Sequence, residues 1–155
     1  MKLRFVWVGK TKSVPMRAMV GDYVDRIRKF TAVEVTELRD RKDAGNDPRR
    51  LIDKEGEEIL SRIGETPCLI ALDERGRELD SRALAALIQK HQLAGTRQIA
   101  FAVGGYGGLS EGVRKRADLV LALSRMTLTH ELARVLLTEQ VYRAFTIIHD
   151  LPYQK

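Results

Sequence analysis

The feature that most constrains the fold is a repeated alternation of short apolar runs with amphipathic stretches. Residues 68–72 and 99–103 are almost wholly apolar, which is typical of strands that are covered on both faces of a parallel sheet. Further strands are expected over residues 3–8, 33–38 and 119–123. Because helix-forming segments separate these runs, the pattern predicts an α/β fold with a mostly parallel sheet flanked by helices.

Two helices are expected in the first half of the chain. Apolar side chains recur at helical spacing over residues 16–30. Asp47 followed by Pro48 is typical of a helix start, because aspartate can cap the first turn and proline suits the first helical position. This second helix is expected to continue through Ile63 and to end near Gly64.

Three more helices are expected in the second half. Either Asp80 or Ser81 can cap a helix that Gly95 would end. A short helix is expected over residues 110–116, and a long final one from about residue 129 to residue 148. Strands and helices therefore alternate along the chain, without an internal repeat or a linker.

Length and composition indicate one globular domain over residues 1–155. The chain has 44% hydrophobic and 31% charged residues, as globular proteins do. Its lone cysteine, Cys68, cannot form an intrachain disulfide, and a chain of this length can bury a core without one. The apolar segment 5–8 is too short for a signal peptide or a membrane span. We therefore expect a cytoplasmic protein that does not contact a membrane.

The chain is basic: 27 lysines and arginines against 21 acidic residues give a net charge of +6 and an isoelectric point near 9.7. Such an excess favours a polyanionic partner such as nucleic acid, and an ordinary basic surface is the alternative interpretation. The excess is gathered in four clusters: Lys10 with Lys12; Arg39, Arg41 and Lys42; Arg49 with Arg50; and Arg114, Lys115 and Arg116. Each cluster could contact a phosphate backbone.

Four glycines in five positions follow the apolar run 99–103, in the segment Gly104-Gly105-Tyr106-Gly107-Gly108. Glycine lets backbone approach a ligand closely, and ligands of open α/β sheets bind beyond the carboxyl ends of the strands. A small-molecule site is therefore expected here, and a plain tight turn is the alternative.

Other nucleotide and metal sites are disfavoured. The glycine segment lacks the dinucleotide pattern G-x-G-x-x-G, because Ser110 stands where the last glycine belongs. Gly9-Lys10-Thr11 imitates the end of a phosphate-binding P-loop, but the required first glycine would be at Arg4. The three histidines are scattered and there is one cysteine, so we expect no metal site.

The expected final helix carries both chemistry and an excess of apolar residues. Glu139 and Arg143 are four residues apart in the favourable order for an ion pair, which could equally be a solvated salt bridge. The apolar positions are too many for one stripe against a single core. A twofold-symmetric dimer packed through this helix would bury them.

Several segments together resemble the ribosomal RNA large subunit methyltransferase H family, a minimal member of the SPOUT class. They are Leu72-Asp73-Glu74-Arg75-Gly76, the segment from Val103 to Gly108, the run from Leu123 to Arg134, Glu139-Gln140-Val141-Tyr142-Arg143-Ala144, and Pro152-Tyr153. Met1-Lys2-Leu3 and Asp53-Lys54-Glu55-Gly56 fit as well. The resemblance covers essentially the whole chain.

The resemblance implies a single SPOUT-like α/β domain with a C-terminal trefoil knot, a topology that sequence periodicity does not predict. It also implies a homodimer that uses S-adenosylmethionine and no metal. The implied reaction methylates N3 of a pseudouridine in a 23S rRNA hairpin on assembled ribosomes.

The resemblance also assigns residues. Those expected to bind the cofactor are Leu72, Gly104, Gly105, Gly108, Leu123, Ser124, Arg125, Met126, Thr127 and Leu128. Arg143 is the candidate for stabilising the anion that forms on the base, Glu139 for orienting Arg143, and Tyr153 for positioning the base or relaying its proton. Arg134 and Lys155 are expected to hold RNA phosphates.

The chain departs from the family at Gln154, where the family usually has histidine. An amide cannot act as a base, although it can imitate a histidine that only positions a neighbour. This departure leaves open an alternative function, a non-catalytic basic RNA-binding module that retains the fold.

Overall fold

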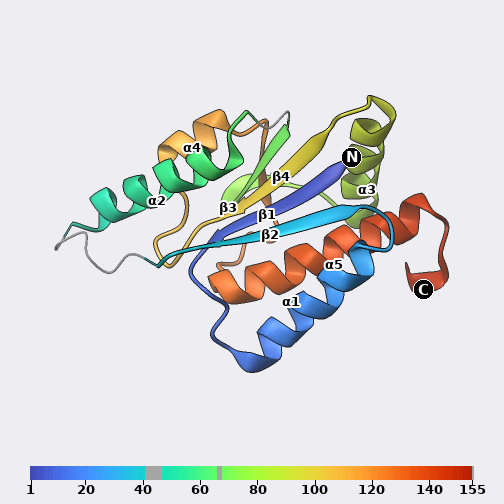
Figure 1. The fold of residues 1–155 in the computed structure, drawn as a ribbon, viewed down its shortest axis with the longest axis horizontal. Coiled ribbons are helices and arrows are strands. Elements are labelled where there is room, and N and C mark those ends of the chain that lie inside the picture. Colours follow the sequence, from blue (N-terminus) through green and yellow to red (C-terminus); the bar gives the residue numbers. More distant parts are fainter. Residues whose placement is uncertain (41–46, 66–67, 155) are drawn as a thin grey trace.

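The computed structural model describes residues 1–40, 47–65 and 68–154, with only the backbone of Gln154. Its centre is a five-stranded sheet in the order β2-β1-β4-β3-β5, and all neighbouring strands are parallel (Figure 1). The strands are β1 (Lys2–Val8), β2 (Ala32–Leu38), β3 (Cys68–Glu78), β4 (Gln98–Val103) and β5 (Leu119–Ala122). The predicted α/β class is confirmed.

Strand β3 is longer than the apolar run 68–72 indicates. It continues to Glu78 beside β5, with an irregular register between Leu72 and Arg77. A Cβ on Gly76 would lie 2.6 Å from the Val120 carbonyl oxygen, so the two strands approach closely where residue 76 has no side chain. The extension was missed because its residues are mostly polar.

The helices are α1 (Val14–Ile27), α2 (Pro48–Ile63), α3 (Ser81–Leu93), α4 (Glu111–Arg116) and α5 (His130–Ile148), followed by a 3-10 turn, Pro152–Gln154. Side chains of Asp47, Asp80 and Thr129 cap α2, α3 and α5 by accepting from backbone N–H groups. Asp80, not Ser81, is thus the cap of α3. Helix α1 begins earlier than expected, because Ser13 caps it, and it ends at Ile27, three residues before Phe30.

Two helical layers cover the sheet, with α1, α3 and α5 on one face and α2 and α4 on the other (Figure 1). Alternate residues of β1 serve the two cores: Phe5 and Trp7 pack beneath the first layer, Val6 and Val8 beneath the second. Helix α5 lies between α1 and α3. The chain itself buries five apolar residues of α5, and the helix also keeps half-buried ones: the buried residues are Val135, Leu137, Val141, Ala144 and Phe145, and the half-buried ones are Leu132, Ala133, Leu136, Tyr142, Ile147 and Ile148.

Within the described residues, no helix is both long enough and apolar enough to cross a membrane.

Candidate functional site

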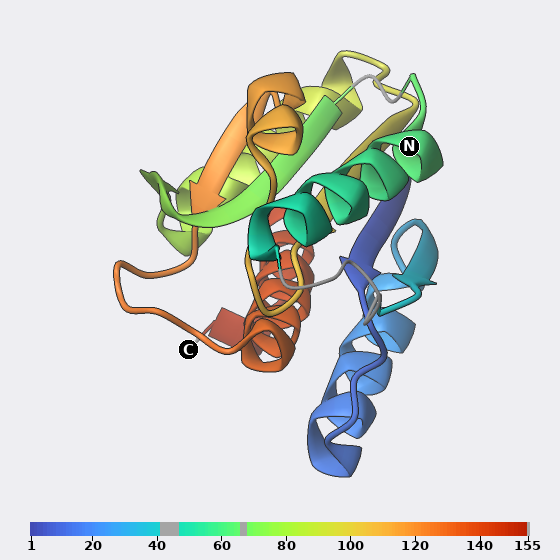
Figure 2. The same ribbon diagram turned by 90° about the vertical axis from the view of Figure 1, so that its left-hand side faces the viewer.

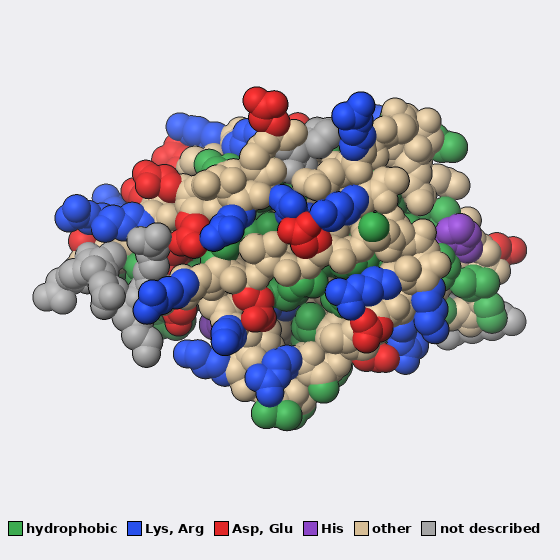
Figure 3. Space-filling model, viewed as in Figure 1, with side chains coloured by type: hydrophobic (Ala, Val, Ile, Leu, Met, Phe, Trp, Pro, Cys, Tyr) green, Lys and Arg blue, Asp and Glu red, His purple; other side chains and the backbone are tan. Residues whose placement is uncertain are grey.

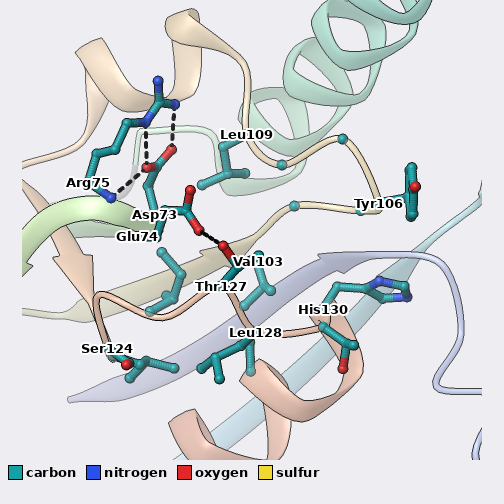
Figure 4. A pocket seen from close by; sticks show the side chains of 18 of the residues that line it. Asp73, Glu74, Arg75, Val103, Tyr106, Leu109, Ser124, Thr127, Leu128 and His130 are labelled. Atoms are coloured by element: carbon teal, nitrogen blue, oxygen red, sulfur yellow. Dashed lines mark hydrogen bonds and ion pairs between the residues drawn. The ribbon is translucent and has the colours of Figure 1, made fainter.

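A cavity of about 570 Å³ opens at the carboxyl ends of β4 and β5, beside the middle of β3 and the first turn of α5 (Figure 4). Nine of the ten residues expected to bind a cofactor line it: Leu72, Gly104, Gly105, Gly108, Leu123, Ser124, Met126, Thr127 and Leu128. Arg125 is not among the lining residues, because its side chain turns to solvent and its Nε lies 2.8 Å from Glu78 Oε2. The structure therefore brings together residues that are up to 56 positions apart in the chain, from Leu72 to Leu128.

The glycine segment forms one wall of this pocket as a tight turn. The Gly108 N–H donates to the Gly105 carbonyl oxygen at 3.1 Å, and Gly108 has a φ of 80°. A Cβ on Gly104 would overlap the Gly108 carbonyl group. The turn thus requires glycine at both positions, and it leaves Tyr106 fully exposed at its tip.

The opposite wall is the loop between β5 and α5. The Thr127 hydroxyl donates to Glu74 Oε2 at 2.7 Å, and the Ser124 hydroxyl accepts from the Met126 N–H at 3.0 Å. The first of these bonds joins the loop to the segment of β3 that also lines the pocket. Between the two walls lie apolar side chains, including Leu72, Val103 and Leu128.

Charge at the pocket is mostly compensated internally. The side chain of Asp73 is 8% exposed, and its oxygens lie 3.0 Å from Arg75 Nε and 3.3 Å from Arg114 Nη1. Burial alone would raise the pKa of Asp73, but bonds from Arg75 and the charge of Arg114 hold it below its usual value. Burial and the nearby charge of Arg134 lower the pKa of His130.

The three predicted catalytic residues form a cluster, termed here the α5 cluster, in which Glu139 and Arg143 lie on the second half of α5 and Tyr153 on the 3-10 turn that follows it. Arg143 donates from Nε and Nη2 to Glu139 Oε1 at 3.0 and 2.6 Å, and the Tyr153 hydroxyl donates to the same oxygen at 3.2 Å. The Arg143 guanidinium lies 4.8 Å from the centre of the Tyr153 ring. Since the side chains of Glu139 and Arg143 are only 15% and 29% exposed, this is not a freely solvated salt bridge.

The electrostatics of the α5 cluster favour a charged arginine and a protonated phenol. The hydrogen bond with Glu139 raises the pKa of Arg143. Burial, together with hydrogen bonds to Tyr23 and Glu139, raises the pKa of Tyr153 well above its usual value. At neutral pH Tyr153 is therefore a donor and a positioning group, and a poor proton acceptor.

The pocket and the α5 cluster are separated within one chain. Ala133 lines the pocket, and Arg143 follows ten residues later on the same helix. At 1.5 Å of rise per residue, the separation along the helix is about 15 Å. The structure therefore does not unite the predicted catalytic and cofactor residues within one protomer.

The expectation that Arg134 holds an RNA phosphate is wrong for this structure. Its side chain is fully buried, donates to the Val8 carbonyl oxygen and to Thr11 Oγ1, and lies over the Trp7 ring. The sequence carried a signal of this, because Arg134 shares a helix face with the buried residues Val141 and Phe145. Lys155, the other expected phosphate contact, and the side chain of Gln154 lie outside the described part.

Exposed basic residues surround the carboxyl edge of the sheet. Lys10 and Lys12 follow β1, Arg39 follows β2, and Arg49 and Arg50 lie at the start of α2. Figure 2 shows this end of the molecule, and Figure 3 shows lysines and arginines spread over the face seen in Figure 1, interspersed with acidic side chains. Arg41 and Lys42 lie outside the described residues.

Several pocket residues were given no individual role from the sequence. They are Asp73, Glu74, Arg75, Tyr106, Thr129 and His130. Glu74 could have been found, because it closely follows the apolar run 68–72, at what was expected to be the carboxyl end of a strand. Within the described residues, no group of three or more His, Cys, Asp or Glu side chains could hold a metal ion.

Comparisons with known proteins find relatives that match the chain over its full length. A family model described as "Predicted SPOUT methyltransferase" matches residues 1–154. The chain is 45% identical over 153 residues to the ribosomal RNA large subunit methyltransferase H of Trichlorobacter lovleyi, covering 99% of both chains. It is 39% identical over 159 residues to the protein of that name from Streptococcus agalactiae, covering 100% of both.

Solved structures share the fold at much lower identity. A probable methylase family protein from Haemophilus influenzae is 14% identical with a TM-score of 0.57, over 99% of this chain and 70% of that one. The tRNA (m1G37) methyltransferase from Aquifex aeolicus is 19% identical with a TM-score of 0.53, over 92% of this chain and 70% of that one. These likenesses confirm the predicted SPOUT-like fold.

Proposed function

The chain belongs to the SPOUT methyltransferase family, and from this premise we propose that it is a cytoplasmic enzyme that methylates 23S ribosomal RNA with S-adenosylmethionine. The observation that carries the proposal is the pocket at the carboxyl edge, where nine of the ten residues expected to bind the cofactor lie together. Full-length similarity to large subunit methyltransferases names the substrate class.

The pocket fits the methyl donor in size and chemistry. A volume of about 570 Å³ lies within the range of small-molecule sites. The glycine turn lets backbone groups approach the adenine edge, and leucine side chains can cover its ring. The donor supplies an electrophilic methyl group on a sulfonium sulfur.

The finer proposal is that the acceptor is N3 of a pseudouridine in a hairpin of assembled ribosomes. As the bond between N3 and the methyl carbon forms, the bond from that carbon to the sulfonium sulfur breaks and S-adenosylhomocysteine leaves. The N3 proton passes to solvent water, so negative charge develops on the base during the step. The charged Arg143 stabilises that anion, and Glu139 holds the guanidinium in place through two hydrogen bonds. Because the Tyr153 phenol stays protonated and donates its O–H to Glu139, it positions the base and does not take up the proton.

A complete site requires a second protomer in this proposal. The pocket and the α5 cluster are about 15 Å apart along one helix, and a twofold homodimer would pair the pocket of one protomer with the α5 cluster of its partner. Leu132, Leu136, Glu139 and Arg143 form a partly exposed stripe at helical spacing that connects the two regions. The expected C-terminal trefoil knot belongs to the same proposal.

The exposed basic residues around the pocket hold the RNA backbone. Lys10, Lys12, Arg49 and Arg50 lie at the edge where the base must enter, and Lys155 is proposed for the same role. Such contacts fix the orientation of the RNA, while the pocket and the α5 cluster select the atom that is methylated. No metal takes part.

Mass spectrometry of rRNA nucleosides tests this function. In cells that make the protein, 23S rRNA should contain N3-methylpseudouridine, and deletion of the gene should remove it. An identical nucleoside profile with and without the protein would contradict the assignment. The alternative, a docking module without catalysis, predicts ribosome binding but no heat when S-adenosylmethionine is titrated into the protein.

A further inference from the structure

We propose that the carboxylate of Glu74 binds the α-ammonium group of the methionine moiety of S-adenosylmethionine. The inference rests on the proposed function, since it concerns how the same pocket recognises its methyl donor. It assigns a specificity-determining role to a residue that was given no individual role from the sequence.

Glu74 is an exposed carboxylate at the pocket, and it has no ion pair among the described residues. Among the described lining residues, the acidic or basic side chains are those of Asp73, Glu74, Arg75 and His130. Asp73 is paired with Arg75 and Arg114. Glu74 forms no ion pair within the described part of the chain, and its carboxylate accepts a hydrogen bond from a neutral hydroxyl, that of Thr127. A cationic group of the ligand would form an ion pair with this carboxylate.

The position of Glu74 suits the amino-acid end of the ligand. Figure 4 shows its carboxylate between the two walls of the pocket, directed toward Thr127, while Tyr106 and His130 lie at the opposite end. The Thr127 hydroxyl occupies Oε2 at 2.7 Å, which leaves Oε1 available for a second donor. An ammonium group offers three N–H donors, and a carboxylate is its natural partner.

Arg75 pairs with Asp73 and not with Glu74. Its guanidinium is bonded twice to Asp73, and the Asp73 charge contributes to raising the pKa of Arg75. Arg75 is therefore engaged with Asp73; the charge of Glu74 also contributes to the raised pKa of Arg75, but the two side chains form no ion pair. The adenosine part is left to the apolar side chains and the glycine turn, where charge is not needed.

Three ligands show which group of the methyl donor the Glu74 carboxylate contacts. S-adenosylmethionine has both the ammonium and the sulfonium charges, S-adenosylhomocysteine keeps the ammonium alone, and 5′-methylthioadenosine lacks the amino-acid moiety. Calorimetric titration of each into the wild-type protein and into Glu74→Gln measures affinity without reference to turnover. The matched control is Glu111→Gln, an exposed carboxylate on α4 that pairs with Lys115 outside the pocket.

Glu74→Gln should weaken both S-adenosylmethionine and S-adenosylhomocysteine by about tenfold, the scale of a charge-assisted hydrogen bond in a partly exposed site. The affinity for 5′-methylthioadenosine should not change, and Glu111→Gln should leave all three affinities as they are. Equal weakening of all three ligands would indicate a distorted pocket and overturn the assignment. Loss confined to S-adenosylmethionine would assign Glu74 to the sulfonium, and no loss would remove it from recognition.

A failure of the proposed function can be told apart from a failure of the Glu74 assignment. If the wild-type protein binds none of the three ligands, the methyl donor itself is wrong. If the wild type binds S-adenosylmethionine and only the Glu74→Gln result disagrees, the function stands and this inference alone falls.

Discussion

The two halves of α5 serve sites of opposite construction. Beside its first turn, the pocket is made of a glycine turn, apolar side chains and charges that are mostly paired. Ten residues later, the α5 cluster is made of a charged arginine, a carboxylate and a phenol around one oxygen atom. The first arrangement can hold a ligand by shape, and the second can stabilise charge, so binding and chemistry should respond to different substitutions.

The largest effect is expected from Gly104→Ala. Its Cβ would overlap the Gly108 carbonyl and open the turn that forms one wall of the pocket. Affinity for S-adenosylmethionine should fall by more than about a hundredfold in calorimetry, because backbone would no longer reach the ligand.

The matched control is Gly21→Ala on α1, where an added Cβ meets nothing within 4 Å. It should leave affinity unchanged and stabilise the fold by up to about 1 kcal/mol. Wild-type affinity in Gly104→Ala would show that the turn is not part of the binding site.

Arg143→Ala should separate chemistry from binding. Removal of one group that stabilises the developing anion should lower kcat on ribosomes by about 10²–10³-fold, while calorimetry shows an unchanged affinity for S-adenosylmethionine. Arg82→Ala, an exposed arginine on α3, is the control and should keep full turnover. If Arg143→Ala methylates at the normal rate, Arg143 has no place in the mechanism.

A smaller effect is expected at Arg134, which lies between the two regions. Arg134→Met removes the donors to Val8 and Thr11, so the free energy of unfolding in urea should fall by about 1–3 kcal/mol. The salt dependence of ribosome binding should stay the same in Arg134→Met, and a reduced dependence would restore the expected role of Arg134 at a phosphate.

The smallest effect is expected from Lys10→Ala, in which an exposed basic side chain is lost. The slope of log affinity for ribosomes against log salt concentration should fall by about one.

The sequence predicted the fold more completely than the site, for a physical reason. Buried strands such as β4 are continuous apolar runs, and helix starts such as that of α2 carry their own caps, so local patterns indicate them. The second half of β3 escaped because its pairing depends on the distant β5. Local patterns contain no information on such a neighbour.

The same limit applies to side chains. The glycine segment and the charged pair on α5 were visible locally, and the resemblance supplied their roles. The burial of Arg134 depends on Trp7 and Val8, more than 120 positions away. Likewise, only the folded chain shows that the pocket reaches Ala133 on the first turn of α5, and so how far it lies from the α5 cluster.

The most direct test of the account is complementation between two inactive variants. In Gly104→Ala the pocket is lost and the α5 cluster is intact; in Arg143→Ala the reverse holds. If one site combines two protomers, unfolding and refolding the variants together should restore methyl transfer to ribosomes to about a quarter of the wild-type rate, because half of the random dimers carry one intact site of two. A mixture that contains mixed dimers and stays as inactive as its components would contradict the account.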